Sequence, residues 1–267
     1  MIKPGEIQQK ARKAGVRDQQ IEKDYVISWI LYGISKHDKL SKALAFKGGT
    51  VLKKVYFKDY RFSEDLDFTL LDDSMTDNEI RSFFMDIFKV IREDANIPVE
   101  ILESNKHEDG GMNFYIGFVG PLGGQGTNKK IKTDISRSEN MAFPARRIPA
   151  LISYSDLPEH ELLCYSLEEV LVEKLRSVMQ RMQARDYFDL WYLLENHQMD
   201  IEFYENEFAQ KCIDKSLNPG DFQNKLTVRL PQYKARWNKS LGEQIRDLPD
   251  FEKVERQVQR HIRKLNI

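Results

Sequence analysis

The chain has 267 residues, of which 41% are hydrophobic and 31% charged, and this length suits one large domain or two modest ones. Its formal net charge of −1 excludes a general electrostatic attraction to nucleic acid. Its two cysteines, Cys164 and Cys212, are far apart in sequence, which argues against a disulfide framework or a zinc site. No apolar run approaches the length of a membrane span and the N-terminus lacks a signal-peptide pattern, so we expect a cytoplasmic protein with no membrane partner.

Hydrophobic periodicity in the first 160 residues predicts a mixture of helices and strands. The expected helices cover 3–42, 50–56 and 78–95, and the expected strands cover 43–47, 66–70, 99–103, 113–119 and 130–135. Residues 144–149 begin and end with proline, which sheet edges tolerate, so we expect an edge segment there.

From Ser166 onward the pattern becomes helical almost throughout, with helices expected over 167–182, 185–196 and 201–212 and weaker segments after Pro219. This change predicts two domains, 1–160 with a sheet and N-terminal helices and 161–267 with helices alone. The expected fold class is α+β, a mixed-sheet domain followed by a helical bundle.

A glycine turn followed by two alternating aspartates is the strongest chemical signal in the chain. Gly48 and Gly49 lie about sixteen residues before Asp65 and Asp67. Residues two apart in a strand point to the same face, so Ser63, Asp65 and Asp67 should line one face. Two carboxylates on one face repel each other unless a cation lies between them, and oxygen ligands suit Mg²⁺, with Mn²⁺ as an alternative. The plain alternative is a polar strand end exposed to water.

A phosphate site and a third carboxylate complete this pattern. Gly48 and Gly49, at a strand-to-helix turn, can bring backbone N–H groups against phosphate oxygens. Asp134 alternates with apolar neighbours in the strand expected over 130–135, so it points away from the core. Alone it is more often a solvated residue; together with the upstream pattern it is a candidate third acid of a two-metal phosphoryl-transfer site.

Lys174 is the main candidate in the helical half. It lies three residues after Leu171 and four before Val178, beside an apolar stripe, so it needs an anionic partner. One interpretation is that Lys174 reaches triphosphate oxygens. The other is an internal ion pair with Asp186 or a snorkelling stem, and the spacing favours neither. Asp186 itself, next to Arg185, is either a catalytic or phosphate-orienting residue or half of a structural salt bridge.

Two further segments carry weaker signals. The loop 120–126 is rich in glycine and proline and either flanks a substrate or merely connects two strands. Near the C-terminus, Arg256, Arg260 and Lys264 share one helical face that could contact an RNA backbone, although charged terminal helices usually just stay hydrated.

At these residues the chain resembles the AbiEii/AbiGii toxin family of nucleotidyltransferases, within the DNA polymerase β-like superfamily. The matching stretches are Glu22-Lys23-Asp24-Tyr25, Phe46-Lys47-Gly48-Gly49-Thr50 through Phe62-Ser63-Glu64-Asp65-Leu66-Asp67-Phe68, Lys132-Thr133-Asp134, and Ser166-Leu167-Glu168-Glu169 through Lys174-Leu175-Arg176, Arg181 and Arg185-Asp186-Tyr187-Phe188-Asp189-Leu190. The resemblance implies a nucleotidyltransferase domain, a helical C-terminal domain that closes over the nucleotide, and the toxin role in a toxin–antitoxin pair. It also implies that Lys174 and Asp186 match the lysine and aspartate of the family. Where superfamily members often carry Gly-Ser, this chain has Gly48-Gly49 followed by Thr50, whose hydroxyl is a candidate substitute.

The resulting hypothesis is a Mg²⁺-dependent nucleotidyltransferase that moves an NMP from an NTP to tRNA, another RNA or a protein, with a cognate antitoxin as a partner. The expected catalytic residues are Asp65, Asp67, Asp134, Lys174 and Asp186, the expected metal ligands are Asp65, Asp67 and Asp134, and the expected nucleotide-binding residues are Gly48, Gly49, Thr50, Ser63 and Lys174. One alternative enzyme is a glycosyltransferase that uses Asp-x-Asp for a nucleotide sugar. A different class is a degenerate, non-catalytic nucleotidyltransferase-fold module that binds a partner protein or RNA.

Overall fold

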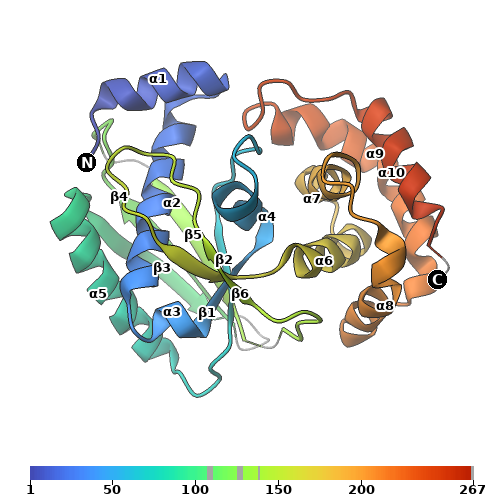
Figure 1. Cartoon of the computed structure of the whole chain (residues 1–267), viewed down its shortest axis with the longest axis horizontal. Helices are drawn as coiled ribbons and strands as arrows, with labels where there is room; N and C mark the ends of the chain where they lie inside the picture. The colour runs from blue at the N-terminus through green and yellow to red at the C-terminus, as the bar shows by residue number, and fades with distance from the viewer. Residues whose placement is uncertain (107–110, 125–128, 138, 266–267) are drawn as a thin grey trace. The chain divides into compact units, whose positions relative to one another are not determined.

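The computed structural model describes residues 1–106, 111–124, 129–137 and 139–265 (Figure 1). The described residues form two compact units, one within the ranges 1–139 and 145–165 and the other within 140–144 and 166–267. The first unit contains a mixed sheet with helices and the second is helical, so the predicted α+β class is confirmed.

The sheet of the first unit has the strand order β3-β4-β5-β2-β1-β7-β6. Its strands are β1 (Leu44–Lys47), β2 (Leu66–Leu70), β3 (Val99–Lys106), β4 (Met112–Phe118), β5 (Lys130–Ser136), β6 (Arg146–Pro149) and β7 (Glu161–Cys164). The β2–β5 and β1–β7 pairs are parallel and the other pairs antiparallel. The segment predicted at the edge of the sheet is β6, an edge strand. Strand β7 has only four residues, too few to show a period in the sequence, and it is fixed by pairing with β6 and β1.

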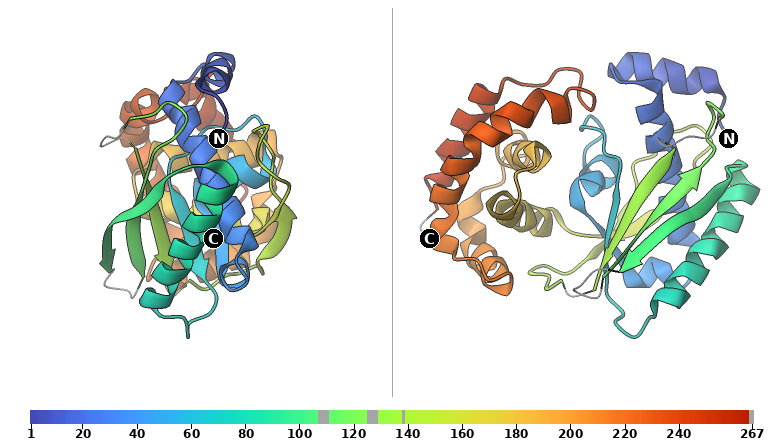
Figure 2. Two further views of the ribbon diagram at one scale, coloured as in Figure 1. Left: turned by 90° about the vertical axis from the view of Figure 1, so that its left-hand side faces the viewer. Right: turned by 180° about the vertical axis from the view of Figure 1, so that it is seen from behind.

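Two long helices of this unit pack against each other and against the sheet, one at β3 and the other at β7. The helices of this unit are α1 (Pro4–Ala14), α2 (Asp18–Lys36), α3 (Leu40–Ala43), α4 (Gly48–Val51), which continues as a π-helical turn (Leu52–Tyr56), and α5 (Asp77–Ala95). Helix α5 begins at a capping box between Thr76 and Glu79, and its Phe84 ring lies 4.9 Å from the Phe114 ring of β4. Figure 2 shows α5 and α4 on opposite sides of the sheet. The face opposite α5 is therefore available for polar residues.

The second unit is built from helices around an aromatic core. They are α6 (Leu167–Gln180), α7 (Ala184–Trp191) with a π-helical turn (Tyr192–Asn196), a 3₁₀ turn (Ile201–Tyr204), α8 (Glu205–Asp214), a 3₁₀ turn (Pro219–Asp221), α9 (Phe222–Leu241) and α10 (Phe251–Ile262). Tyr187 of α7 stacks on Tyr233 of α9, with ring centroids 5.0 Å apart and planes 12° apart. Within the described parts of both units, no helix combines the length and apolar character needed to cross a bilayer.

Candidate active site

Parallel pairing between β2 and β5 places two of the predicted carboxylates side by side. Asp67 and Asp134 are direct partners in the register, so their side chains leave the same face of the sheet. Along β5 the buried residues alternate with half-buried ones, and Lys132 and Asp134 belong to the half-buried set. The aspartates therefore lie on the face opposite α5, as the alternation in sequence predicts.

The glycine turn after β1 lies directly against Asp67. Gly48 has φ +79°, in the region that favours glycine, and a Cβ built on it would lie 2.5 Å from Asp67 Oδ2. Both the backbone conformation and the neighbouring carboxylate therefore require the absence of a side chain at Gly48. The turn and Asp67 form one local structure.

We expect Gly48→Ala to lower enzymatic activity by about 10²-fold or more, because the added methyl group must displace the Asp67 carboxylate from its position. The strained φ alone costs roughly 1–2 kcal/mol. Gly124→Ala is the matched control, since Gly124 also has positive φ (+75°) but has no heavy atom within 4 Å of a built Cβ. Equal losses in the two variants, measured as initial rates at matched folded fraction, would contradict a specific role for the Gly48–Asp67 contact.

The hydroxyl of Thr50 holds the approach to β2 in place. Thr50 Oγ1 lies 2.6 Å from the Asp65 carbonyl oxygen and 2.8 Å from Ser63 Oγ, and both hydroxyl side chains are buried. A hydroxyl has one proton to donate, so this arrangement engages Thr50 within the protein. In this geometry Thr50 and Ser63 tie the glycine turn to the residue before β2, and their predicted role as nucleotide ligands stays a prediction.

Lys132 lies among the acidic side chains and was not singled out from the sequence. Its ammonium is 2.9 Å from Asp134 Oδ2. Partial burial alone would lower the pKa of Lys132, but Asp134, followed by Asp67 and Asp65, raises it above its ordinary value. The three carboxylates therefore act on one cation. The signal was available in sequence, because Lys132 is two residues before Asp134 and must share its face.

The donor chemistry of this face suits a hard cation, since Asp65, Asp67 and Asp134 offer only carboxylate oxygen. Over the residues that the structure describes, no group of three or more histidine, cysteine, aspartate or glutamate side chains is close enough together to hold a metal ion. A metal shared by all three carboxylates thus requires their side chains to move closer together than they are here. Their assignment as metal ligands stays a prediction.

The stretch Glu22-Lys23-Asp24-Tyr25 in α2 contacts two segments of the first unit that lie near the candidate site in sequence or space. Glu22, only 1% exposed, accepts hydrogen bonds from Leu122 N (2.8 Å) and Lys129 Nζ (2.6 Å), and so anchors the described part of the loop 120–126. Residues 125 and 126 of that loop lie outside the described part of the chain. Lys23 pairs with Glu64 at 2.7 Å, next to Asp65. This stretch therefore fixes two segments of backbone, a role that sequence alone did not assign to it.

In the second unit, Lys174 lies in a buried ion-pair cluster. Its ammonium, in a side chain only 5% exposed, is 2.8 Å from Asp186 Oδ1 and 2.6 Å from Asp189 Oδ2. Of the two interpretations left open by the sequence, the internal ion pair describes this environment. The cluster joins α6 to α7.

Arg181, at the end of α6, completes this cluster. Its Nε donates to Asp186 Oδ2 at 2.6 Å and its Nη2 to Oδ1 at 3.1 Å, a two-point contact. Burial alone would raise the pKa of Asp186, but Lys174 and then Arg181 hold it below its ordinary value. Asp186 therefore stays ionised and orients both cations, and its predicted catalytic role stays a prediction.

The basic C-terminal face is partly neutralised within the same unit. Arg260 Nη2 lies 2.7 Å from Glu195, and Lys264 lies 3.3 Å from Asp200. Two of the three cations considered for RNA contact therefore have carboxylate partners, which weakens that interpretation.

Comparison with known proteins connects this arrangement to an enzyme family. A family model described as "Nucleotidyl transferase AbiEii toxin, Type IV TA system" matches residues 29–260. No curated protein matches the chain. Among solved structures, MenT4, nucleotidyltransferase toxin Rv2826c from Mycobacterium tuberculosis H37Rv, matches with a TM-score of 0.71 at 17% identity. The match covers 98% of this chain and 88% of that chain. JHP933 from Helicobacter pylori has a TM-score of 0.60 at 16% identity, with 94% of this chain and 93% of that chain covered. At such identities these likenesses show the fold.

Proposed function

We infer the function from one premise: this chain belongs to the AbiEii family of nucleotidyltransferase toxins of type IV toxin–antitoxin systems. It is therefore a nucleotidyltransferase. We propose that it transfers an NMP from an NTP to an RNA acceptor, with tRNA the expected class, and that a cognate antitoxin protein counteracts it. The observation that carries this proposal is the pairing of Asp67 with Asp134 beside the Gly48 turn.

Each part of this arrangement has a role in the proposed reaction. Backbone N–H groups after Gly48 would hold the β- and γ-phosphates, with Ser63 beside them. Asp65 and Asp67 would hold Mg²⁺, or Mn²⁺ in its place, and the bound cation would supply charge neutralisation for the triphosphate. Asp134 would share in holding the cation and would accept the proton of the attacking hydroxyl.

The bonds follow from these roles. The acceptor oxygen forms a bond to the α-phosphorus, the bond from that phosphorus to the oxygen that bridges to the β-phosphate breaks, and pyrophosphate leaves. The predicted role of Lys174 and Asp186 toward the leaving pyrophosphate stays a prediction. No cysteine or histidine nucleophile takes part in this scheme.

The proposal is tested by incubating the protein with each of the four α-labelled NTPs and either total cell RNA or cell protein. We expect label in RNA and stoichiometric pyrophosphate release with one NTP preferred. Label that appears in protein alone would show that the acceptor is a protein and not RNA. Absence of transfer with every NTP and acceptor would overturn the enzymatic proposal for this site.

A binding-only module remains the second candidate, because Asp134 is engaged by Lys132 and the three carboxylates are not gathered into a metal-holding group. This candidate predicts that the protein binds Mg²⁺–NTP but releases no pyrophosphate with any acceptor. Pyrophosphate release therefore distinguishes the enzyme from the binding-only module.

Lys132→Met should strengthen the binding of Mn²⁺ by about tenfold, because it removes a competing positive charge from beside the carboxylates. Calorimetric titration with Mn²⁺ checks this, and Lys58→Met, at an exposed position outside the sheet, is the control. Unchanged Mn²⁺ affinity in Lys132→Met would show that the cation does not bind beside these carboxylates.

A further inference from the structure

The face that carries Asp134 continues across β4 to the edge strand β3. In the register, Asn113 lies opposite Asp134, Tyr115 opposite Lys132, and Gly117 opposite Lys130, so all six leave the same side of the sheet. None of them lies on the α5 side, where Phe114 is buried. A continuous surface within the first unit therefore joins the candidate active site to the edge of the sheet.

An aromatic ring and a lysine form the middle of this surface. The Lys130 ammonium lies over the Tyr115 ring at 4.3 Å from its centroid. Among the described residues, no ion pair involves Lys130, and its ammonium contacts the Tyr115 ring, so a phosphate can pair with it from the solvent side. A half-buried tyrosine ring beside such a cation is the combination that binds single-stranded nucleic acid, by stacking with a base and pairing with a phosphate.

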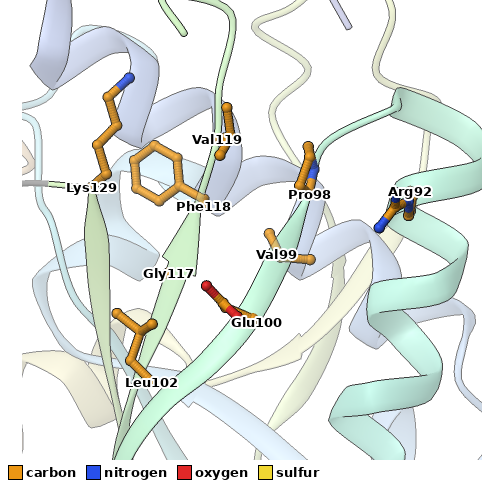
Figure 3. Close-up of a pocket in the computed structure, with 9 residues that line it drawn as sticks. All are labelled: Arg92, Pro98, Val99, Glu100, Leu102, Gly117, Phe118, Val119 and Lys129. Atoms are coloured by element: carbon orange, nitrogen blue, oxygen red, sulfur yellow. The ribbon is translucent and has the colours of Figure 1, made fainter. Parts of the chain in front are cut away.

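A pocket of about 340 Å³ lies at the edge of the sheet where this surface ends (Figure 3). Residues of both faces line it: Glu100 and Gly117 from this surface, and Val99 and Arg92 from the α5 side. Leu102 covers Gly117, where a built Cβ would lie 2.9 Å from the leucine side chain. Glu100 from β3 and Arg92 from α5 line the same pocket and offer an acceptor and a donor. Apolar surface with polar groups at its rim suits the flat faces and polar edges of a nucleobase.

We propose that this surface, formed by Tyr115, Lys130 and the Leu102–Gly117 pocket, binds the single-stranded end of the acceptor RNA. The Tyr115 ring would stack on one base, Lys130 would contact a phosphate, and the pocket would take a second base. This inference rests on the proposed function and adds the path by which the acceptor reaches Asp134.

The direction of the reaction favours the acceptor over the NTP as the occupant. In-line displacement puts the attacking hydroxyl and the leaving pyrophosphate on opposite sides of the α-phosphorus. The Gly48 turn follows β1, on one side of the β2–β5 pair, whereas β4 and β3 lie on the other side. Triphosphate held at Gly48 therefore leaves the β4 side to the attacking strand.

The dimensions agree with a short RNA segment. Lys130 is four positions before Asp134, about 13 Å along the strand at ~3.3 Å per residue. At roughly 3.4 Å per stacked nucleotide, this corresponds to about four nucleotides between the reacting hydroxyl and the far end of the surface. The path thus selects for an unpaired terminus of that length.

The test is binding of a short single-stranded RNA oligonucleotide, fluorescein-labelled at its 5′ end, to the full chain without NTP. We expect Tyr115→Ala to weaken binding by about tenfold and Tyr115→Phe, which keeps the ring, to leave it nearly unchanged. Lys130→Ala should reduce the slope of log affinity against log salt concentration by about one, the change expected for the loss of one phosphate contact. Lys89→Ala is the matched control, because Lys89 is 72% exposed on α5, the helix that covers the other face.

Gly117→Ala tests the pocket separately. The added methyl group pushes Leu102 into the pocket, so the preference among oligo(A), oligo(C) and oligo(U) should diminish while the Tyr115 contribution remains. Wild-type protein that does not bind RNA, or Tyr115→Ala that binds RNA normally, would overturn the inference; a raised KM for the NTP in that variant would assign the ring to the nucleotide. Pyrophosphate release by the wild type is measured independently, so failure of the nucleotidyl-transfer proposal is distinguished from failure of this one.

Discussion

Asp67→Asn should reduce nucleotidyl transfer by at least about 10³-fold while leaving the fold intact. Asp67 lies beside Asp134 in the register and against the Gly48 turn, so it links the two halves of the proposed site. Loss of a single preorganised electrostatic contact typically costs ~10²–10³ in rate, and here the lost charge also neutralises the triphosphate. The amide keeps the shape of the side chain, so the effect reports charge.

Transfer of labelled NMP to RNA measures this effect, and circular dichroism verifies the fold. Asp73→Asn is the control, because it removes the same charge from the same unit at an exposed position in the turn after β2. Undiminished transfer in Asp67→Asn would remove this carboxylate from the chemistry.

Lys174→Ala should lower the free energy of unfolding by about 3–5 kcal/mol. The substitution leaves Asp186 and Asp189, both buried, without the ammonium that lies within 2.8 Å of each, and an uncompensated buried charge is strongly destabilising. Arg181 still contacts Asp186, which places the expected value toward the lower end of that range.

Urea unfolding followed by tryptophan fluorescence measures this loss, because Trp191 and Trp237 both lie in the second unit. Lys239→Ala, at an exposed position of α9 in that unit, should change stability by less than about 0.5 kcal/mol. If Lys174→Ala abolished transfer without lowering stability, the lysine would act on the substrate alone and the ion-pair cluster would contribute no stability.

The local features of the first unit could be predicted from sequence because they follow from strand periodicity. Asp65, Leu66, Asp67 and Phe68 alternate in chemistry, and the structure buries Leu66 and Phe68 while Asp67 stays on the polar face. The same reasoning placed Asp134 on the polar face of β5. Their adjacency depends on parallel pairing between β2 and β5, which are separated by two other strands in the chain, so no local pattern specifies it.

The interaction partners of buried polar side chains could not be predicted from the sequence. Spacing showed that Lys174 needed an anion but left Asp186 and phosphate as equal choices, and only tertiary packing decides which one lies within reach. Thr50 was considered for its hydroxyl, and the structure engages that hydroxyl with Asp65 and Ser63 in the loop before β2. Lys132 was overlooked although strand periodicity assigns it to the same face as Asp134.

Binding of Mn²⁺ in the presence of NTP, followed by electron paramagnetic resonance, tests most directly whether Asp67 and Asp134 form the catalytic centre. We expect wild-type protein to bind Mn²⁺ together with NTP, and Asp67→Asn and Asp134→Asn each to weaken this binding by about tenfold or more, with Asp73→Asn unchanged. Equal Mn²⁺ affinity in all four proteins would contradict the assignment of nucleotidyl transfer to these two strands.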